Sequence, residues 1–285
     1  MNLELPRWSG STSRPRLQLP PGATDCHHHI YDTRFPAAPT GTLFHDDALV
    51  EDYSKLAAWL GIERQVVVQP SLYGKDNSLL LAALKAFGGA ARGIAVISPD
   101  LSDADLRALQ AGNVRGVRIN TRLPGSVGLE ALEALAVRVA PLGWHVQLVL
   151  NPDTLPELEP KLHALPCPVV IDHMAHLRGA AGRQHPAFDC VARLLQAGKT
   201  WLKLSGAYIG CESAGGTYPD AVLIGRAFAD IAPERMLWGS DWPHPTAQTT
   251  KPDDTALLDL LCAFAPDAAV RTRILVENPA SLYGF

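Results

Sequence analysis

The stretch HVQLVLNPDTLPELEPKLHAL at residues 145–165 contains the repeating unit of this protein. Its first six residues form an apolar run with β-branched valines, which is typical of a short buried strand. In the second half, leucines at 155, 158, 162 and 165 recur three or four residues apart. That spacing places them on one face of an amphipathic helix. The stretch therefore predicts one strand followed by one helix.

The same unit recurs along the whole chain. Apolar runs that we interpret as strands cover residues 23–30, 65–70, 93–98, 116–120, 145–150, 169–174, 201–205 and 236–241. Segments with helical periodicity follow, among them 47–60, 78–87, 103–110, 129–139 and 155–165. Strands that are apolar throughout are buried on both faces, and eight of them joined by helices close most economically into a parallel barrel.

We therefore predict an α/β fold with a single (β/α)8 barrel of the TIM type. The chain has 285 residues, and one such barrel needs about 250. An open doubly wound sheet is the alternative. The barrel is expected to span 23–285, and residues 1–22 form an N-terminal arm that packs along its surface or is partly ordered.

Composition excludes several classes of protein. Hydrophobic residues make up 47% and charged residues 19%, as in ordinary globular proteins. The net charge of −4 includes no basic run, so we expect no nucleic-acid partner and no membrane partner. The five cysteines stand far apart, and no segment resembles a signal peptide or a membrane span. A cytoplasmic location is the expectation.

Polar residues gather where the predicted strands end, which is the catalytic end of a barrel of this kind. Because side chains alternate along a strand, His27 and His29 point to one side and His28 to the other. With His173 and Asp241 they make either a zinc-type site or a cluster of donors around a substrate carbonyl. The segments concerned are DCHHH at 25–29, DHM at 172–174, KLSG at 203–206 and GSDWPH at 239–244.

These segments resemble the amidohydrolase superfamily. The HxH that ends the first strand, IDH on strand six and LWGSDWPHP at 237–245 carry the likeness. The chain from about residue 23 to 285 is more narrowly similar to the branch of that superfamily that processes lactones. This narrower likeness rests on VVVQPSLYGKDN at 66–77, VRGVRIN at 114–120, WLKLSG at 201–206 and ENPASLYGF at 277–285.

The resemblance implies roles for individual residues. Asp241 matches the general base that activates water, and His27, His29 and His173 match the groups that face the substrate carbonyl. Arg118 and Ser71 match substrate-binding positions. A guanidinium binds a carboxylate well, although a structural salt bridge is an equal alternative for Arg118. A serine after proline is also common in turns.

Other residues are assigned from their position alone. Tyr73 follows Ser71 in a loop and is predicted to place its hydroxyl at the pocket wall, with aromatic packing as the alternative. Gln147 is predicted to contact a lactone from strand five. We expect Lys203 to pair with an acid inside the barrel, and Trp242 to raise the pKa of Asp241 by desolvation. We expect three further histidines to lie in loops or at the rim: His176, His185 and His244.

The ligand set departs from that of metal-dependent amidohydrolases. These enzymes commonly use a lysine or glutamate on strand four and a histidine on strand five, where this chain has Arg118 and Val149. A binuclear centre is therefore not expected. The resemblance to a lactonase that works without a metal favours no cofactor. One zinc ion on His27, His29 and Asp241, with His173 as a further ligand, is the alternative.

The sequence thus predicts an enzyme that hydrolyses a small lactone bearing a carboxylate. An isomerase of sugar-acid lactones is the first alternative, because a substrate hydroxyl can replace water in the same reaction. A zinc-dependent decarboxylase is the second alternative. A binding protein without catalytic activity is the third.

Overall fold

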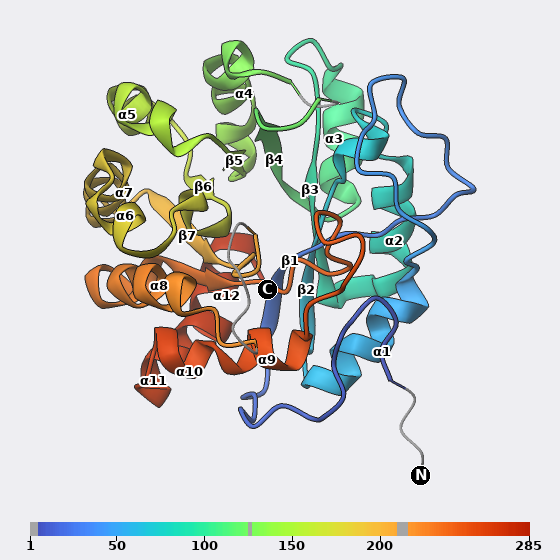
Figure 1. Ribbon diagram of the computed structural model, residues 1–285. Coiled ribbons are helices and arrows are strands. Elements are labelled where there is room, and N and C mark those ends of the chain that lie inside the picture. The colour runs from blue at the N-terminus through green and yellow to red at the C-terminus, as the bar shows by residue number, and fades with distance from the viewer. Residues whose placement is uncertain (1–4, 125–126, 210–215) are drawn as a thin grey trace.

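Eight parallel strands form a barrel in the computed structural model, which describes residues 5–124, 127–209 and 216–285. Neighbours along the chain are neighbours in the sheet, in the order β1 to β8 (Figure 1). The last strand returns to the first, since the amide of Asp241 donates to the His27 carbonyl at 2.7 Å and the amide of His29 to the Trp242 carbonyl at 2.8 Å. The prediction of a (β/α)8 barrel is confirmed. The strands are β1 Thr24–His28, β2 Arg64–Val68, β3 Ala91–Ala95, β4 Val114–Asn120, β5 His145–Val149, β6 Val169–Ile171, β7 Thr200–Leu204 and β8 Met236–Trp238.

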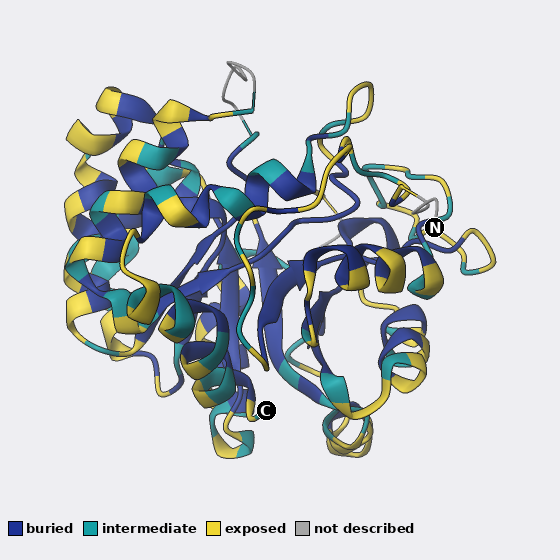
Figure 2. Cartoon of the chain, turned by 90° about the horizontal axis from the view of Figure 1, so that it is seen from below, coloured by how far each residue is buried: buried dark blue, intermediate teal, exposed yellow. Residues whose placement is uncertain are grey.

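The helices surround the strands and turn their exposed sides outward, while the strands are buried (Figure 2). The longer helices, such as α1, α2, α4, α7 and α8, bury an apolar stripe, which is the pattern that amphipathic spacing predicts. The helices are α1 Val50–Leu60, α2 Ser78–Phe87, α3 Asp103–Ala111, α4 Leu132–Val139, α5 Leu155–Ala164, α6 Gly179–Gln184, α7 Pro186–Gln196, α8 Pro219–Ile231, α9 Asp254–Asp259, α10 Leu261–Phe264, α11 Ala268–Thr272 and α12 Asn278–Tyr283.

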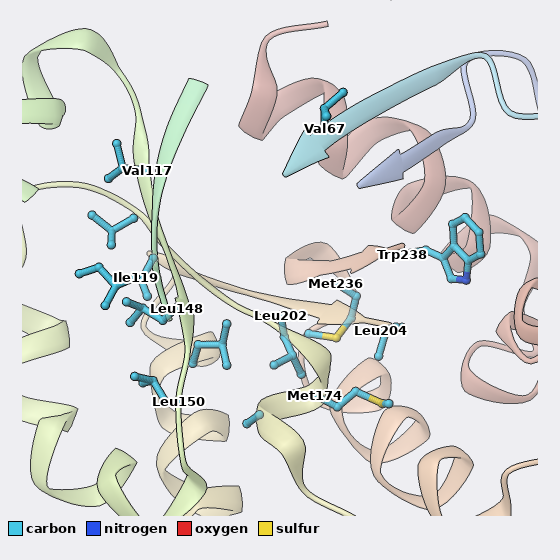
Figure 3. Close-up of a cluster of buried hydrophobic side chains, with 14 of the residues drawn as sticks. Val67, Val117, Ile119, Leu148, Leu150, Met174, Leu202, Leu204, Met236 and Trp238 are labelled. Carbon is cyan, nitrogen blue, oxygen red and sulfur yellow. The ribbon is translucent and has the colours of Figure 1, made fainter. Parts of the chain in front are cut away.

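The main apolar core lies between the strands and the helices. Figure 3 shows part of it, with Ile119 of β4, Leu148 of β5 and Leu202 of β7 among the packed side chains. Their neighbours Arg118, Gln147 and Lys203 lie on the opposite face of the strands and are buried inside the barrel. The barrel interior is therefore polar beneath the C-terminal ends of the strands.

Six of the eight strands are shorter than predicted, and the differences at β6 and β8 concern the site. β6 ends at Ile171 and β8 at Trp238, whereas the apolar runs indicated ends at residues 174 and 241. His173 and Asp241 have φ angles of 53° and 63°, in the left-handed region that no strand can adopt. Both residues thus stand on tight turns just beyond their strands.

The N-terminal arm lies against the loops that follow β1 and β8. The indole of Trp8 donates to the Asp47 carbonyl at 2.9 Å, and the indole of Trp242 donates to the Arg7 carbonyl at 2.9 Å. A third indole, that of Trp59 in α1, donates to the Ser13 carbonyl at 3.2 Å. These contacts join the arm to the end of the barrel that carries the polar residues.

Among the described residues, no helix is long enough and apolar enough to cross a membrane.

Candidate active site

A cavity opens at the C-terminal ends of the strands. Its volume is about 190 Å³, which suits a small molecule. Polar groups reach it from four directions: His29 after β1, Arg118 on β4, His173 after β6 and Asp241 after β8. The rest of the wall combines the apolar residues Leu43, Leu123, Val149 and Ile209 with the polar residues Ser71, Asn120, Arg122, His176 and Thr246. Polar groups that converge on a partly apolar cavity are typical of a ligand site.

The two histidines of the first strand meet the aspartate of the last. The Nε2 atoms of His27 and His29 lie 3.3 Å apart, and the Oδ1 atom of Asp241 lies 3.6 Å from the first and 3.5 Å from the second. His28 points away and stacks on Tyr53 of α1, with ring centroids 3.5 Å apart. The alternation along β1 thus brings the predicted pair together.

Gly239 makes the close approach of β8 to β1 feasible. A Cβ atom built at this position would stand 2.6 Å from the Cβ of His27, which is closer than real side chains allow. Any other residue there would push His27 away from Asp241.

His173 reaches the cavity through an unusual turn. The four residues of the short turn η6, His173–His176, have φ angles between 52° and 55°. This is a left-handed turn without glycine, and each such residue costs roughly 1–2 kcal/mol. The turn sends Met174 and Ala175 into the hydrophobic core, while both histidines line the cavity. The Nδ1 of His173 lies 2.9 Å from the Ser205 hydroxyl.

A buried charge network supports the site from below. The Nζ of Lys203 donates to the Gln147 amide oxygen at 2.7 Å and lies 3.3 Å from Oδ1 of Asp172, so the expected pairing of Lys203 with an acid is confirmed. The same ammonium and the same carboxylate each lie 3.3 Å from Nδ1 of His27. The guanidinium of Arg118 stands 3.8 Å from the other oxygen of Asp172. The network holds His27 in place from behind.

The pKa shifts of Asp241 and of the nearby histidines determine which of these groups is charged. Burial alone would raise the pKa of Asp241, but the neighbouring imidazoles of His173, His29 and His27 outweigh it and hold the pKa below the ordinary value. Burial lowers the pKa of His27 to about 4 and that of His173 to about 3. A charged carboxylate therefore stands beside the neutral imidazoles of His27 and His173 at neutral pH. The predicted desolvation does act to raise the pKa of Asp241, but the imidazoles outweigh it and the net shift is downward. The Trp242 ring packs against Tyr53.

Tyr208 is a contact that the sequence motifs did not reveal. It follows β7, and its hydroxyl donates to Oδ2 of Asp241 at 2.7 Å. This bond fixes the carboxylate so that Oδ1 faces the histidines. A tyrosine three residues after the WLKLS strand gives no signal of its own in the sequence.

The four predicted substrate-binding residues separate into two pairs. Arg118 and Ser71 line the cavity. Tyr73 lies outside it, since its hydroxyl donates to the carbonyl of Asp32 and accepts from the amide of Asp32. Gln147 lies beneath the cavity. Its amide oxygen accepts a hydrogen bond from Lys203, and its amide nitrogen donates one to Asp172 at 2.8 Å. Neither of the second pair is placed to contact a ligand.

The histidines predicted for the rim also differ in placement. His176 lines the cavity. There burial lowers the pKa of its imidazole to about 2, so the ring is neutral at neutral pH. His244 lies in the loop after β8, as one of the two predicted placements has it, but it is fully buried 3.0 Å from the Asp254 carboxylate and so is not a rim residue. Its partner comes from the first residue of α9, which the strand pattern does not predict.

The donor set fits a single metal ion. His27, His173 and Asp241 each offer one atom, and these atoms lie within 4.8 Å of one another. His29 adds a fourth group. Its Nδ1 lies 2.7 Å from the Val68 carbonyl and must donate to it, so in the neutral ring that binds a metal the lone pair is on Nε2. Imidazole nitrogens and a carboxylate are the usual ligands of zinc. Arg118 and Val149 supply no ligand on β4 or β5.

Comparison with known proteins shows what this chain is similar to. A curated relative, the 2-pyrone-4,6-dicarboxylate hydrolase of Comamonas testosteroni, is 36% identical over 97% of this chain and 94% of its own. The D-galactarolactone isomerase of Agrobacterium fabrum is 33% identical over 96% of this chain and 94% of its own. A crystal structure of an Agrobacterium tumefaciens protein in its apo form matches with a TM-score of 0.89 and 32% identity, and covers 98% of this chain and 99% of the other.

The family model described as amidohydrolase matches residues 24–285, which is the whole barrel. Both the matched range and the identity of the relatives lead to one conclusion: the chain belongs to the amidohydrolase family.

Proposed function

We propose that this protein hydrolyses a small lactone that bears a carboxylate group. One observation carries the proposal: the charged carboxylate of Asp241 and the guanidinium of Arg118 line the same small cavity, with neutral imidazoles beside the carboxylate. A base, donors for an oxyanion and a cationic anchor are what lactone hydrolysis requires. Two curated relatives are named for a lactone substrate and for a pyrone dicarboxylate, which supports the same chemistry.

In the proposed reaction, Asp241 takes a proton from a water molecule as the water oxygen attacks the lactone carbonyl. The Nδ1 of His173 accepts a hydrogen bond from Ser205, so the Nε2–H of His173 is free to donate to the developing oxyanion. The bond from the carbonyl carbon to the ring oxygen then breaks, and the proton held by Asp241 passes to the departing oxygen. Arg118 holds the substrate carboxylate through the remaining N–H groups of its guanidinium.

An isomerase is the second candidate, because an isomerase is among the similar relatives. A hydroxyl of the substrate would take the place of water, and the lactone ring would move to that oxygen. The base, the donors and the anchor are the same in both reactions.

We propose that the reaction proceeds without a metal. The ammonium of Lys203, 3.3 Å from Nδ1 of His27, and the guanidinium of Arg118 add positive charge where a bound cation needs negative charge. His27, His29, His173 and Asp241 would be the ligands of a zinc ion. When bound, zinc would polarise the carbonyl and lower the pKa of a coordinated water.

A panel of lactones tests these proposals together. D-Galactarolactone, 2-pyrone-4,6-dicarboxylate and muconolactone would be assayed in water enriched in ¹⁸O, before and after dialysis against a chelator. We expect turnover of at least one lactone, with one ¹⁸O atom in the product carboxylate and no loss after dialysis. Product without ¹⁸O would favour the isomerase, and activity that is lost on dialysis and restored by zinc would contradict the metal-free proposal. No turnover of any lactone would contradict the proposed function.

A further inference from the structure

The imidazole of His176 lines the cavity and forms no hydrogen bond with the described residues. Its ring stands beside that of His173, with centroids 5.5 Å apart, and it lines the same cavity as Asp241. The Nε2 atom is shielded from solvent and has no hydrogen-bond partner within the parts of the chain that the structure describes. A buried imidazole nitrogen without a partner is unfavourable in a free protein, because it has lost its bonds to water. The ring of His176, which lines the cavity, is therefore available for a hydrogen bond with a bound ligand.

The backbone conformation that brings His176 to the cavity is strained. The left-handed turn of His173–His176 places both imidazoles on the cavity side and both apolar residues between them, Met174 and Ala175, in the core. A turn of four left-handed residues without glycine persists only where its surroundings hold it, and such strain gathers at functional sites. His173 alone would need one residue of this turn. The continuation to position 176 brings the second imidazole to the cavity.

The chemistry of the neighbours indicates what His176 binds. Arg118 and Arg122 already offer two cationic groups to the cavity, and they suit the carboxylate of a substrate. A neutral imidazole can both donate and accept a hydrogen bond, and so can a hydroxyl group. The hydroxyls of Ser71 and Thr246 line the same cavity and have the same dual character. The cavity therefore offers groups that suit alcohols in addition to the two cationic groups that suit a carboxylate.

We propose that His176 forms a hydrogen bond with a hydroxyl group of the bound lactone, and that this contact selects hydroxylated lactones over lactones without that hydroxyl. The inference rests on the proposed function, since it names the class of lactone that the same cavity takes. His176 thereby determines specificity, while the proposed bond-making groups are those around Asp241.

The test combines substrate and side-chain deletions. D-Galactarolactone and a series of analogues, each with one hydroxyl replaced by hydrogen, would be assayed with the wild type, His176→Phe and His176→Gln. Phenylalanine keeps the ring without its nitrogens, and glutamine keeps a donor and an acceptor. His163→Phe, at an exposed position on α5, is the matched control.

We expect one analogue to lose at least about tenfold in kcat/KM with the wild type, as a buried group left without its partner predicts. His176→Phe should lose a similar factor with the parent lactone and nothing more with that analogue, while His176→Gln and the control stay within a few-fold of wild type. The inference is overturned if the wild type handles all analogues as it handles the parent, if His176→Phe weakens all substrates equally, or if only muconolactone is turned over. The comparison of substrates with the wild type decides the matter even where His176→Phe does not fold. No turnover of any lactone would overturn the proposed function and this inference with it.

Discussion

At the scale of single residues, the site depends on the buried ammonium group of Lys203, which does not line the cavity. Lys203 is fully buried, and Asp172, Gln147 and His27 surround its Nζ. Charges of this kind are stable only as a set, because each one compensates the desolvation of another.

We predict that Lys203→Met destabilises the fold by about 3–5 kcal/mol, since it leaves the buried carboxylate of Asp172 with Arg118 as its main cationic neighbour, 3.8 Å away. The double variant Lys203→Met with Asp172→Asn should recover part of that loss, because neither charge then remains uncompensated. Urea unfolding of the three proteins measures the difference. A double variant less stable than the single one would contradict the charge network.

A second residue-scale prediction concerns pH. Burial lowers the pKa of His145 from 6.5 to about 3, and neither ring nitrogen has a hydrogen-bond partner among the described residues. The unfolded chain binds a proton below pH 6.5 and the folded chain does not, so stability is full above that pH and falls as the pH decreases. Between pH 7.5 and 5.0 this residue alone should cost about 2 kcal/mol.

His145→Phe, which keeps the ring contact with Tyr283, should therefore have a flatter dependence of unfolding free energy on pH than the wild type, by about 2 kcal/mol over this range. A constant difference between the two proteins does not matter, because the slope is the test. The exposed His163→Phe serves as the reference. Parallel curves for His145→Phe and wild type would show that the buried histidine does not control acid stability.

Sequence patterns located some site residues and missed others for physical reasons. The pairing of His27 with His29 follows from alternation along a strand, so it could be predicted. Tyr73 stands two residues from Ser71, but a turn directs its hydroxyl to Asp32. His176 and Tyr208 lie beyond strand ends, where the backbone conformation that aims them has no sequence period.

At the scale of elements, the ends of β6 and β7 show how backbone and side chains are adjusted to each other. Gly206 follows β7 with a φ of 63°, and a Cβ atom there would stand 2.9 Å from Nδ1 of His173. The glycine provides both the left-handed conformation and the room for the imidazole.

Gly206→Ala should therefore displace His173 and reduce turnover at least about tenfold, while it destabilises the fold by about 1 kcal/mol or more through backbone strain. Gly198→Ala is the matched control, because Gly198 has a φ of 87° but its nearest contact is the end of the Arg235 side chain at 3.5 Å. Both variants share the strain, and only the first affects the site. Thermal unfolding and steady-state kinetics separate the effects. Equal activity of the two variants would argue against the role of Gly206.

The strands and helices themselves were largely predictable. α2, Ser78–Phe87, has the bounds that the helical spacing indicates, and β5 differs from its prediction by one residue. The left-handed turn of His173–His176 was not, because no glycine marks it. Packing of Met174 and Ala175 in the core holds it, together with hydrogen bonds from the amides of Ala175 and Leu177 to the carbonyls of Asp172 and Met174.

At the scale of the whole molecule, the barrel follows from strands that are buried on both faces and from helices that are apolar on one. Closure brings β1 and β8 together. It thereby brings Asp241 to His27 and His29, which lie more than two hundred residues earlier in the sequence. The sequence could predict that these groups share one end of the barrel. It could not predict the depth of each group, so Gln147 was expected in the cavity that it only supports.

The central claim is that Asp241 is the base of a lactone reaction, and Asp241→Asn tests it most directly. With a lactone that the wild type turns over, we predict that kcat falls by about 10²- to 10⁴-fold while calorimetric titration still detects binding of the lactone. Asp153→Asn, an exposed aspartate on the same end of the barrel, should keep wild-type activity. An Asp241→Asn protein that is folded, binds the lactone and turns it over within about tenfold of the wild-type rate would contradict the account.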